Sequence, residues 1–335
     1  MNLRRSPAAF AAALVALLIA LAGTLTGCGA DPQASAGGAD GEKITLRVGV
    51  IGSGNRLTGP VGYLHSRNAL VPLLAGAGVG EVKVFSFPNG PDLNQALVAG
   101  ELDVATYGDT PALVARGAGQ PTRLIAQAAV GLDAAIVAKK GGPGSLKELA
   151  GRKIATQTGS YMHRYLLGAL DDAKVKPQEI LHIYAPDVEA ALERGDVDAA
   201  AVPAANVEAL RKKGYPVIDT LAIDHPRYRG TSATVVTDSF LDAHPGFVKI
   251  WQAAQNEATR QAKANWDDYL AFAVSVGGFP ADIVRKTTLK EQLPDTPFTD
   301  EGLALLEGTK QFLVRQGFIR KDFAIDDWIA PGARG

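Results

Sequence analysis

The stretch from Ile44 to Asp238 alternates short β-forming runs with segments whose apolar residues recur at helical spacing. This alternation constrains the fold more than any other feature, because strands separated by helices pair into a mostly parallel sheet. In the first half, the expected strands are residues 44–51, 81–87, 102–107 and 122–129. The expected helices are residues 62–75, 91–100 and 110–118, the last with Thr110 as N-cap and Pro111 at its first helical position. We therefore predict an α/β protein.

A second set of the same kind follows the glycine-rich break at residues 139–144. Its expected strands are residues 152–156, 180–184, 197–202 and 216–220, and its expected helices are residues 160–171, 187–194 and 204–213. Two β-rich segments, Ala134 to Ala138 and Ser232 to Thr237, bracket this set, and the pattern after Asp238 is almost entirely helical.

The pattern predicts two α/β lobes joined by a hinge of two crossings. Lobe 1 comprises residues 43–138 plus 238–335, and lobe 2 comprises residues 139–237. The chain is expected to cross between them near residues 138–142 and 233–238.

The two lobes share a sequence echo, in which residues 91–105 (PDLNQALVAGELDVA) recur as residues 186–200 (PDVEAALERGDVDAA). Each copy predicts a helix with an aspartate near its start, Asp92 or Asp187. A glycine with positive φ is expected to end the helix before a strand begins. Chance similarity between common α/β segments is the alternative to a repeated structural unit.

The N-terminus has the layout of an export signal, because Arg4 and Arg5 precede an apolar run over residues 8–22. An uncleaved membrane anchor is the alternative, since a span needs about 20 apolar residues. The following LTGC at Leu25 to Cys28 resembles the bacterial lipobox, whose cysteine is acylated and becomes the mature N-terminus. We therefore expect a signal peptide over residues 1–27 and a lipid-bearing, flexible tether over residues 28–42.

Composition excludes several function classes. Cys28 is the single cysteine, so the exported part has neither a disulfide nor a catalytic thiol. The five histidines lack metal-ligand spacing, and no phosphate-binding loop of the GxxxxGK type occurs, so we expect no cofactor and no metal. Cleavage before Cys28 leaves a formal charge of about −3, and no basic patch suggests nucleic acid as a partner.

Two strand-to-helix turns are the main candidates for a ligand site. They are Tyr107 to Pro111 (YGDTP) in the first set and Thr156 to Tyr161 (TQTGSY) in the second. In open α/β sheets, ligands bind beyond the carboxyl ends of the strands, and helix N-termini there offer free N–H donors to an anion. The alternative for Thr110 and Ser160 is that they are ordinary N-caps.

Other residues join these turns as candidates. Arg56, in a third turn after the first strand, is a candidate partner for a carboxylate or sulfonate, unless it is merely solvated. Asp133 is a candidate partner for a ligand ammonium or a plain turn residue, and the two tyrosines either wall the ligand or lie half-buried on the lobe surface. The candidate residues are Ser53, Gly54, Asn55, Arg56, Tyr107, Gly108, Asp109, Thr110, Asp133, Thr158, Gly159, Ser160 and Tyr161.

Nearly the whole chain after the tether resembles the type II periplasmic binding proteins of nitrate, sulfonate, taurine and thiamine-precursor import systems. The resemblance is carried by residues 89–119, by residues 146–160 (LKELAGRKIATQTGS) and by residues 192–200 (LERGDVDAA). The turn Gly108 to Pro111 looks closest to the aliphatic-sulfonate binders. In sulfonate and nitrate relatives, a tryptophan and a Pro-containing turn follow the second-lobe aspartate. Here Asp198 leads into alanines and Pro203, which we add to the candidate residues.

The resemblance implies a monomeric, extracytoplasmic solute-binding subunit that delivers a small organic anion, first of all an aliphatic sulfonate, to an ABC permease and its ATPase. Lipid on Cys28 would hold the protein at a membrane. The resemblance implies no catalytic activity. Two alternatives remain open: an enzyme of the thiamine-pyrimidine-synthase type on the same fold, although its cysteine-rich motif is missing here, and a surface sensor on this scaffold.

Overall fold

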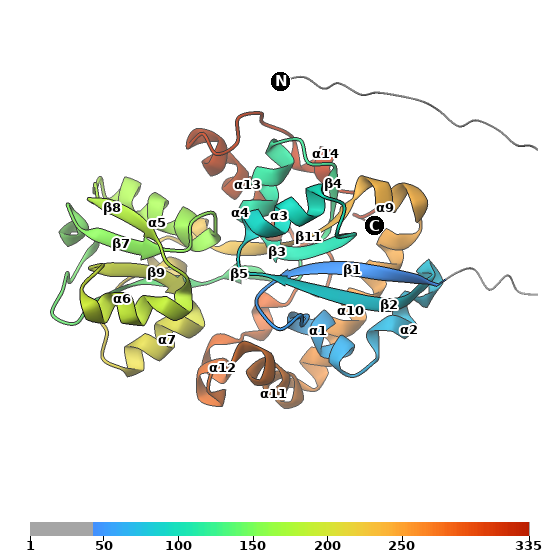
Figure 1. Cartoon of the computed structure of the whole chain (residues 1–335), viewed down its shortest axis with the longest axis horizontal. Coiled ribbons are helices and arrows are strands. Elements are labelled where there is room, and N and C mark those ends of the chain that lie inside the picture. Colours follow the sequence, from blue (N-terminus) through green and yellow to red (C-terminus); the bar gives the residue numbers. More distant parts are fainter. Residues whose placement is uncertain (1–42, 335) are drawn as a thin grey trace, which may run out of the picture. The chain divides into compact units, whose positions relative to one another are not determined.

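The structure is a computed structural model that describes residues 43–334. The expected signal peptide (1–27) and the expected tether with Cys28 (28–42) lie outside the described residues. Among residues 43–334, no helix combines the length and apolar character needed to cross a membrane. Residues 43–334 form one compact unit built around two β-sheets (Figure 1).

The first sheet has six strands in the order β2-β1-β3-β11-β4, with β5 paired to β11. β1 is parallel to β2 and β3, whereas β11 is antiparallel to β3, β4 and β5. Alternating apolar side chains of β1, such as Leu46, Val48 and Val50, are fully buried against the flanking helices. The strands are β1 (Ile44–Ile51), β2 (Val79–Phe87), β3 (Val104–Gly108), β4 (Thr122–Ala126), β5 (Val130–Leu132) and β11 (Gly230–Thr237).

The second sheet has five strands in the order β10-β6-β9-β7-β8. Its β7 is parallel to β8 and β9, and β6 is antiparallel to β9 and β10. Small side chains dominate the central strands, so helices approach the sheet closely; Ala199, Ala200 and Ala201 are at most 2 % exposed. The strands are β6 (Ala134–Ala138), β7 (Lys153–Thr156), β8 (Glu179–His182), β9 (Ala199–Pro203) and β10 (Val217–Thr220).

The strand pairing corrects the lobe to which the sequence assigned two β-rich segments, residues 134–138 and 232–237. Residues 134–138 were expected in the first lobe, but β6 hydrogen-bonds to β9 and β10 of the second sheet. Residues 230–237 were expected in the second lobe, but β11 lies between β3 and β4 of the first sheet. Both strands are almost completely buried, and burial alone gives no hint of which sheet a strand joins. The chain therefore passes between the sheets at Asp133 and again between β10 and β11.

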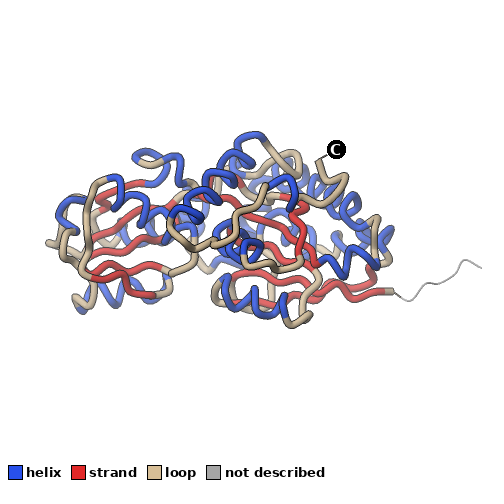
Figure 2. The backbone as a smooth tube through the Cα atoms, turned by 90° about the horizontal axis from the view of Figure 1, so that it is seen from above, coloured by secondary structure: helices blue, strands red, loops and turns tan. Residues whose placement is uncertain are grey.

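Helices flank both sheets (Figure 2). The helices of the first half are α1 (Gly59–Ser66), α2 (Leu70–Leu74), α3 (Gly90–Val98) and α4 (Asp109–Gly117). Around the second sheet lie α5 (Tyr161–Asp172), α6 (Val188–Arg194), α7 (Ala204–Lys212) and α8 (Leu221–Asp224). After β11 come α9 (Asp238–Ala243), α10 (Phe247–Ala264), α11 (Trp266–Gly277), α12 (Ala281–Thr287), α13 (Asp300–Arg315) and α14 (Ile325–Trp328). Short 3-10 turns cover Ala75–Ala77, Leu146–Leu149, Ala185–Asp187, Pro226–Tyr228 and Lys290–Gln292.

Two local expectations differ from the structure. The helix expected at residues 62–75 is two helices, because Asn68 takes a positive φ of 58° between α1 and α2. The N-cap of α4 is Gly108, not Thr110, so the helix begins two residues earlier than expected. In the echo, the helix-ending glycines do adopt positive φ, +72° at Gly100 and +74° at Gly195. Asp92 lies in the first turn of α3, as expected, and Asn89 is the N-cap, with its Oδ1 accepting the backbone N–H of Asp92 at 2.8 Å.

Candidate ligand-binding site

A cavity of about 310 Å³ lies where strands of both sheets end and helices begin. The cavity-lining residues from the first sheet and its helices are Ile51, Thr58, Gly90, Thr106, Tyr107, Gly108, Pro111, Leu132 and Ser232. Those from the second sheet and its helices are Gln157, Thr158, Gly159, Ser160, Tyr161, Met162 and Pro203. The volume is at the lower end of the range of small-molecule sites, roughly 300–1,000 Å³.

Helix N-termini from both sheets meet at this cavity. Thr58 is the N-cap of α1, Gly108 of α4, Ser160 of α5 and Pro203 of α7, and Gly90 is the first residue of α3. Each of these helices has eight or more residues. Their N-terminal ends carry partial positive charge and unpaired N–H groups, so the cavity favours an anion.

Glycine at position 90 allows two of these helix ends to lie close together. A Cβ atom at Gly90 would lie 2.3 Å from the Pro111 Cβ, which is far inside van der Waals contact. The first turns of α3 and α4 therefore approach each other only because position 90 has no side chain.

Within residues 43–334, the backbone N–H groups of Tyr161 and Met162 donate to no protein acceptor. They are the first two residues of α5, where a helix leaves its N–H groups without intrahelical partners. The third, that of His163, donates to the capping Ser160 Oγ at 3.2 Å. Two residues that line the cavity thus have backbone N–H groups without a protein partner.

Seven of the candidate residues named from the sequence line this cavity: Tyr107, Gly108, Thr158, Gly159, Ser160, Tyr161 and Pro203. The tyrosine hydroxyls are engaged by the protein. Tyr107 donates to Asn94 Oδ1 at 2.8 Å, and Tyr161 donates to the carbonyl of Asp133 at 3.0 Å. Burial raises the pKa of both phenols, so each presents a neutral ring to the cavity.

Asp109 and Thr110 do not line the cavity, contrary to expectation. Asp109 is completely buried, where Oδ2 accepts the backbone N–H of Thr231 at 2.9 Å and lies 3.5 Å from Nη2 of Arg164. The Thr110 hydroxyl donates to Asp109 Oδ1 at 2.9 Å and is 3 % exposed. The polar side chains of this turn thus serve the core between α4, α5 and β11, whereas Tyr107, Gly108 and Pro111 line the cavity.

Asp133 also lies outside the cavity lining. Its Oδ1 accepts the backbone N–H groups of Ala134 at 2.8 Å and Ala222 at 2.9 Å. The side chain therefore ties the passage between the sheets to the start of α8.

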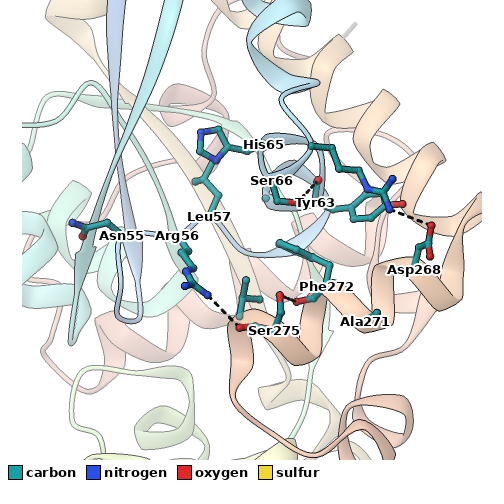
Figure 3. Close-up of a pocket in the computed structure, with 13 residues that line it drawn as sticks. Asn55, Arg56, Leu57, Tyr63, His65, Ser66, Asp268, Ala271, Phe272 and Ser275 are labelled. Atoms are coloured by element: carbon teal, nitrogen blue, oxygen red, sulfur yellow. Dashed lines mark hydrogen bonds and ion pairs between the residues drawn. The ribbon is translucent and has the colours of Figure 1, made fainter.

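The third turn, at Ser53 to Arg56, is not brought to the cavity. Its residues are exposed, and Asn55 and Arg56 line a separate groove of about 550 Å³ between α1 and α11. Figure 3 shows Arg56 directed to α11, where Nη1 donates to the carbonyl of Ser275 at 3.3 Å. Although larger, this groove is lined only by residues of α1, α11 and the adjoining loops, with none from the second sheet, and the exposed Arg67–Asp268 ion pair at 3.1 Å crosses it. We therefore place the candidate site in the smaller cavity.

Two histidines hold the turn at residues 157–160. His163 Nδ1 accepts the backbone N–H of Gly159 at 3.3 Å, and His182 Nδ1 accepts that of Thr158 at 3.3 Å. Thr158 Oγ1 also lies 2.5 Å from His182 Nδ1. Both roles require a ring nitrogen with a free lone pair, and a protonated imidazole has none. His163 therefore holds Gly159 as an uncharged imidazole.

Because of this arrangement, we expect the free energy of unfolding to decrease in acid. Burial lowers the pKa of His163, and the neighbouring His182 lowers it further. The unfolded chain then binds a proton more readily than the folded chain, so the free energy of unfolding should fall as pH drops through the ordinary imidazole pKa near 6.5. Urea denaturation at pH 7.5 and 5.5 measures this. His163→Asn keeps an acceptor without titrating and should reduce the difference; an unchanged difference would contradict the assignment.

Sequence reasoning missed several lining residues outside the two candidate turns: Ile51, Thr58, Gly90, Thr106, Leu132, Met162 and Ser232. Ile51 and Thr106 carried a usable signal, because both stand near the carboxyl end of an expected parallel strand. Leu132 and Ser232 carried none, since the position of Leu132 depends on the pairing of β5 with β11 and that of Ser232 on the pairing of β11 with β3. Among residues 43–334, no group of three or more His, Cys, Asp or Glu side chains is arranged to hold a metal ion.

Two sheets of mixed α/β topology with a cavity at their strand ends define a fold of the periplasmic binding protein class. Solved structures agree with this. The alkanesulfonate-binding protein SsuA from Xanthomonas axonopodis pv. citri, bound to MOPS, superposes with a TM-score of 0.70 at 21 % identity, covering 87 % of this chain and 99 % of that one. The desulfurization enzyme DSZB has the same fold, with a TM-score of 0.66 at 20 % identity over 86 % of this chain and 97 % of the enzyme.

Residues 77–268 match the family described as NMT1/THI5 like, and the chain belongs to that family. The resemblance stated from the sequence is thereby confirmed. Among curated relatives, the taurine-binding periplasmic protein of Escherichia coli (strain K12) is 29 % identical over 245 residues, which cover 69 % of this chain and 76 % of the relative.

Proposed function

We propose that this chain is the extracytoplasmic solute-binding subunit of an ABC-type importer and that it captures a small organic sulfonate for a permease and its ATPase. The residues around each sheet form the two lobes that enclose the ligand. The observation that carries the proposal is the cavity at which helix N-termini from both sheets meet. Family membership and the names of the sulfonate- and taurine-binding relatives support the same function.

The electrostatics of the cavity favour an anion without a basic side chain. The described lining residues include no Lys, Arg or His, so the positive potential comes from helix ends and from free N–H groups such as those of Tyr161 and Met162. Hydrogen bonds to a charged group contribute about 1.5–3 kcal/mol each. A few such hydrogen bonds, after subtraction of the free-energy cost of association, supply the binding free energy of roughly 8 kcal/mol that a micromolar complex has. The three oxygens of a sulfonate suit such a set of donors.

A pair of substitutions at Ser160 tests the anion directly. Asparagine and aspartate are both good N-caps, so Ser160→Asn and Ser160→Asp should each keep α5 intact. Only the aspartate adds negative charge to the cavity, so we expect Ser160→Asp to weaken sulfonate binding at least about tenfold relative to Ser160→Asn, through like-charge repulsion. Titration calorimetry measures the two affinities. Equal affinities would argue against a bound anion.

The N-terminal sequence supports attachment to a membrane by lipid. We expect the wild-type protein to fractionate with membranes, because the LTGC motif at Leu25 to Cys28 follows an apolar export signal. Cys28→Ser removes the only thiol that lipid could modify and should release the protein or leave it unprocessed. Membrane fractionation with palmitate labelling measures this; a wild-type protein that carries no label would refute lipidation.

The relative DSZB is an enzyme on this fold, so catalysis is the alternative to transport. The arrangement of the cavity supports binding instead. The Ser160 hydroxyl donates to the carbonyl of Gln157 at 2.5 Å, and the Ser232 hydroxyl accepts the N–H groups of Ala128 and Ala129. Neither serine is paired with a general base, as a nucleophile would need to be. Incubating the protein with a sulfonate or sulfinate and assaying for sulfite tests the alternative, and sulfite release would favour the enzyme.

A further inference from the structure

The turn that follows α13, residues 315–321 (RQGFIRK), places an exposed aromatic ring among three cations. Phe318 is 45 % exposed, which is unusual for a large apolar side chain in residues 43–334. Arg315, Arg320 and Lys321 are exposed as well. Within the described part of the chain, no ion pair and no side-chain hydrogen bond involves any of these three cations. We call residues 315–321 the basic loop.

The carboxylates beside the basic loop do not neutralise it, because another cation holds them. Asp322 Oδ1 lies 3.0 Å from Nζ of Lys310, and Glu307 Oε1 lies 3.2 Å from the same atom. The Lys310 side chain is only 7 % exposed, so its ammonium faces these two carboxylates rather than solvent. The basic loop therefore keeps all three of its positive charges at the surface.

The backbone fixes Phe318 in this exposed position. The N–H groups of Phe318 and Ile319 both donate to the carbonyl of Leu313, at 2.9 and 3.2 Å, and Gly317 takes a positive φ of 75°. The Phe318 ring also lies edge-on to His163, with 6.0 Å between the ring centroids. A single exposed apolar residue is common on proteins and needs no partner. The combination of a fixed aromatic ring with three unpaired cations is what indicates an anionic, partly apolar partner.

We propose that the basic loop docks on anionic phospholipids, with the three cations against the headgroups and Phe318 at the boundary between headgroups and acyl chains. Lys and Arg are attracted to anionic headgroups, and aromatic rings favour that boundary. Residues 28–42 separate the expected lipid on Cys28 from the compact unit, and a chain of that length spans at most about 50 Å. Such a tether keeps the protein near a membrane without choosing which face meets it. The basic loop makes that choice, whatever ligand the cavity binds.

The first experiment measures contact between position 318 and lipid. Phe318→Trp in the full-length protein keeps an aromatic ring there and adds a fluorophore. The protein is mixed with vesicles of phosphatidylcholine, or of phosphatidylcholine with phosphatidylglycerol, each carrying brominated phosphatidylcholine as quencher. After subtraction of the unsubstituted protein's signal, we expect the ratio of quenched to unquenched emission from the added indole to be at least about tenfold higher on the phosphatidylglycerol vesicles. Equal ratios would overturn the proposal, because the N-terminal sequence is the same in both samples.

A matched pair of triple variants, both made in the Phe318→Trp protein, tests the cations. One variant replaces the cations of the basic loop: Arg315→Gln, Arg320→Gln and Lys321→Gln. The control removes the same charge from exposed lysines that form no ion pair within the described residues: Lys147→Gln, Lys176→Gln and Lys249→Gln. On phosphatidylglycerol vesicles, we expect the ratio of quenched to unquenched emission to be at least about tenfold lower in the first variant than in the control. An equal ratio in both would show that net charge, and not the basic loop, governs the contact.

An acidic surface of a membrane protein is the other partner that the three cations would suit. Native membranes and vesicles of phosphatidylglycerol distinguish it from lipid. If native membranes protect the added indole of Phe318→Trp from acrylamide, while brominated lipid in the vesicles does not quench it, the basic loop meets a protein and the lipid proposal is wrong. Quenching by brominated lipid in vesicles that hold no other protein supports the proposal.

Discussion

Replacing Gly159 with valine is expected to weaken ligand binding by about 100-fold. Gly159 has a φ of +78°, a conformation that costs a β-branched residue on the order of 1–3 kcal/mol. The residue also lines the cavity, and a Cβ there would already touch Pro91 Cγ at 3.5 Å, so the larger valine would force apart the turn and the start of α3. Titration calorimetry with a sulfonate measures the loss.

Gly195→Val is the matched control for this substitution. Gly195 has nearly the same φ, +74°, but it ends α6, a Cβ added there would meet no atom within 4 Å, and the residue does not line the cavity. Both variants should lose similar stability from backbone strain, yet only Gly159→Val should lose affinity. An equal loss of affinity in both would show that the effect on binding comes from destabilisation rather than from the cavity.

Removing the Asp109 carboxylate should have the largest effect on stability. Asp109 and Arg164 are 0 % and 1 % exposed, and burial lowers the pKa of Arg164 while Asp109 opposes that change. In Asp109→Ala the guanidinium would stay buried without a counter-ion, and Thr231 would lose the acceptor of its backbone N–H. Breaking a buried pair in this way costs about 3–5 kcal/mol. Urea denaturation should show that loss in the free energy of unfolding.

Asp268→Ala is the control for the loss of an ion pair as such. Asp268 pairs with Arg67 at 3.1 Å, but the two side chains are 65 % and 50 % exposed, so the pair should contribute at most about 1 kcal/mol. If Asp109→Ala cost no more than Asp268→Ala, the buried pair would not be the link between α4 and α5 that we describe.

The two turns at the cavity show where sequence reasoning succeeds and where it stops. The turn at residues 157–161 was correctly expected to offer N–H donors, because a strand, a glycine and a serine N-cap follow one another within a few residues. The turn at residues 107–111 also joins a strand to a helix through a glycine, yet the side chains of Asp109 and Thr110 are buried in the core. The difference is Arg164, which lies 55 residues away in the chain and is invisible to local patterns.

Local sequence patterns also do not reveal the long-range contacts that place β6, β11 and Arg56. Strands β6 and β11 are buried along their whole length, so neither periodicity nor flanking turns reveal which sheet they join. Arg56 follows a strand that does end at the cavity, but its loop turns toward α11, and that choice depends on helices more than 200 residues later. Element positions follow from local spacing, whereas the assignment of side chains to a site follows from long-range pairing.

We propose above all that the cavity binds a small sulfonate and that the negative charge of the sulfonate is what it recognises. The most direct measurement is titration calorimetry of the full-length protein with 1-butanesulfonate and with 1-butanesulfonamide, which has a similar size but no charge, in a buffer free of sulfonates. We expect the sulfonate to bind with a dissociation constant roughly in the micromolar range and the sulfonamide to bind at least about tenfold more weakly. Equal binding of the two, or binding of the sulfonamide alone, would contradict it.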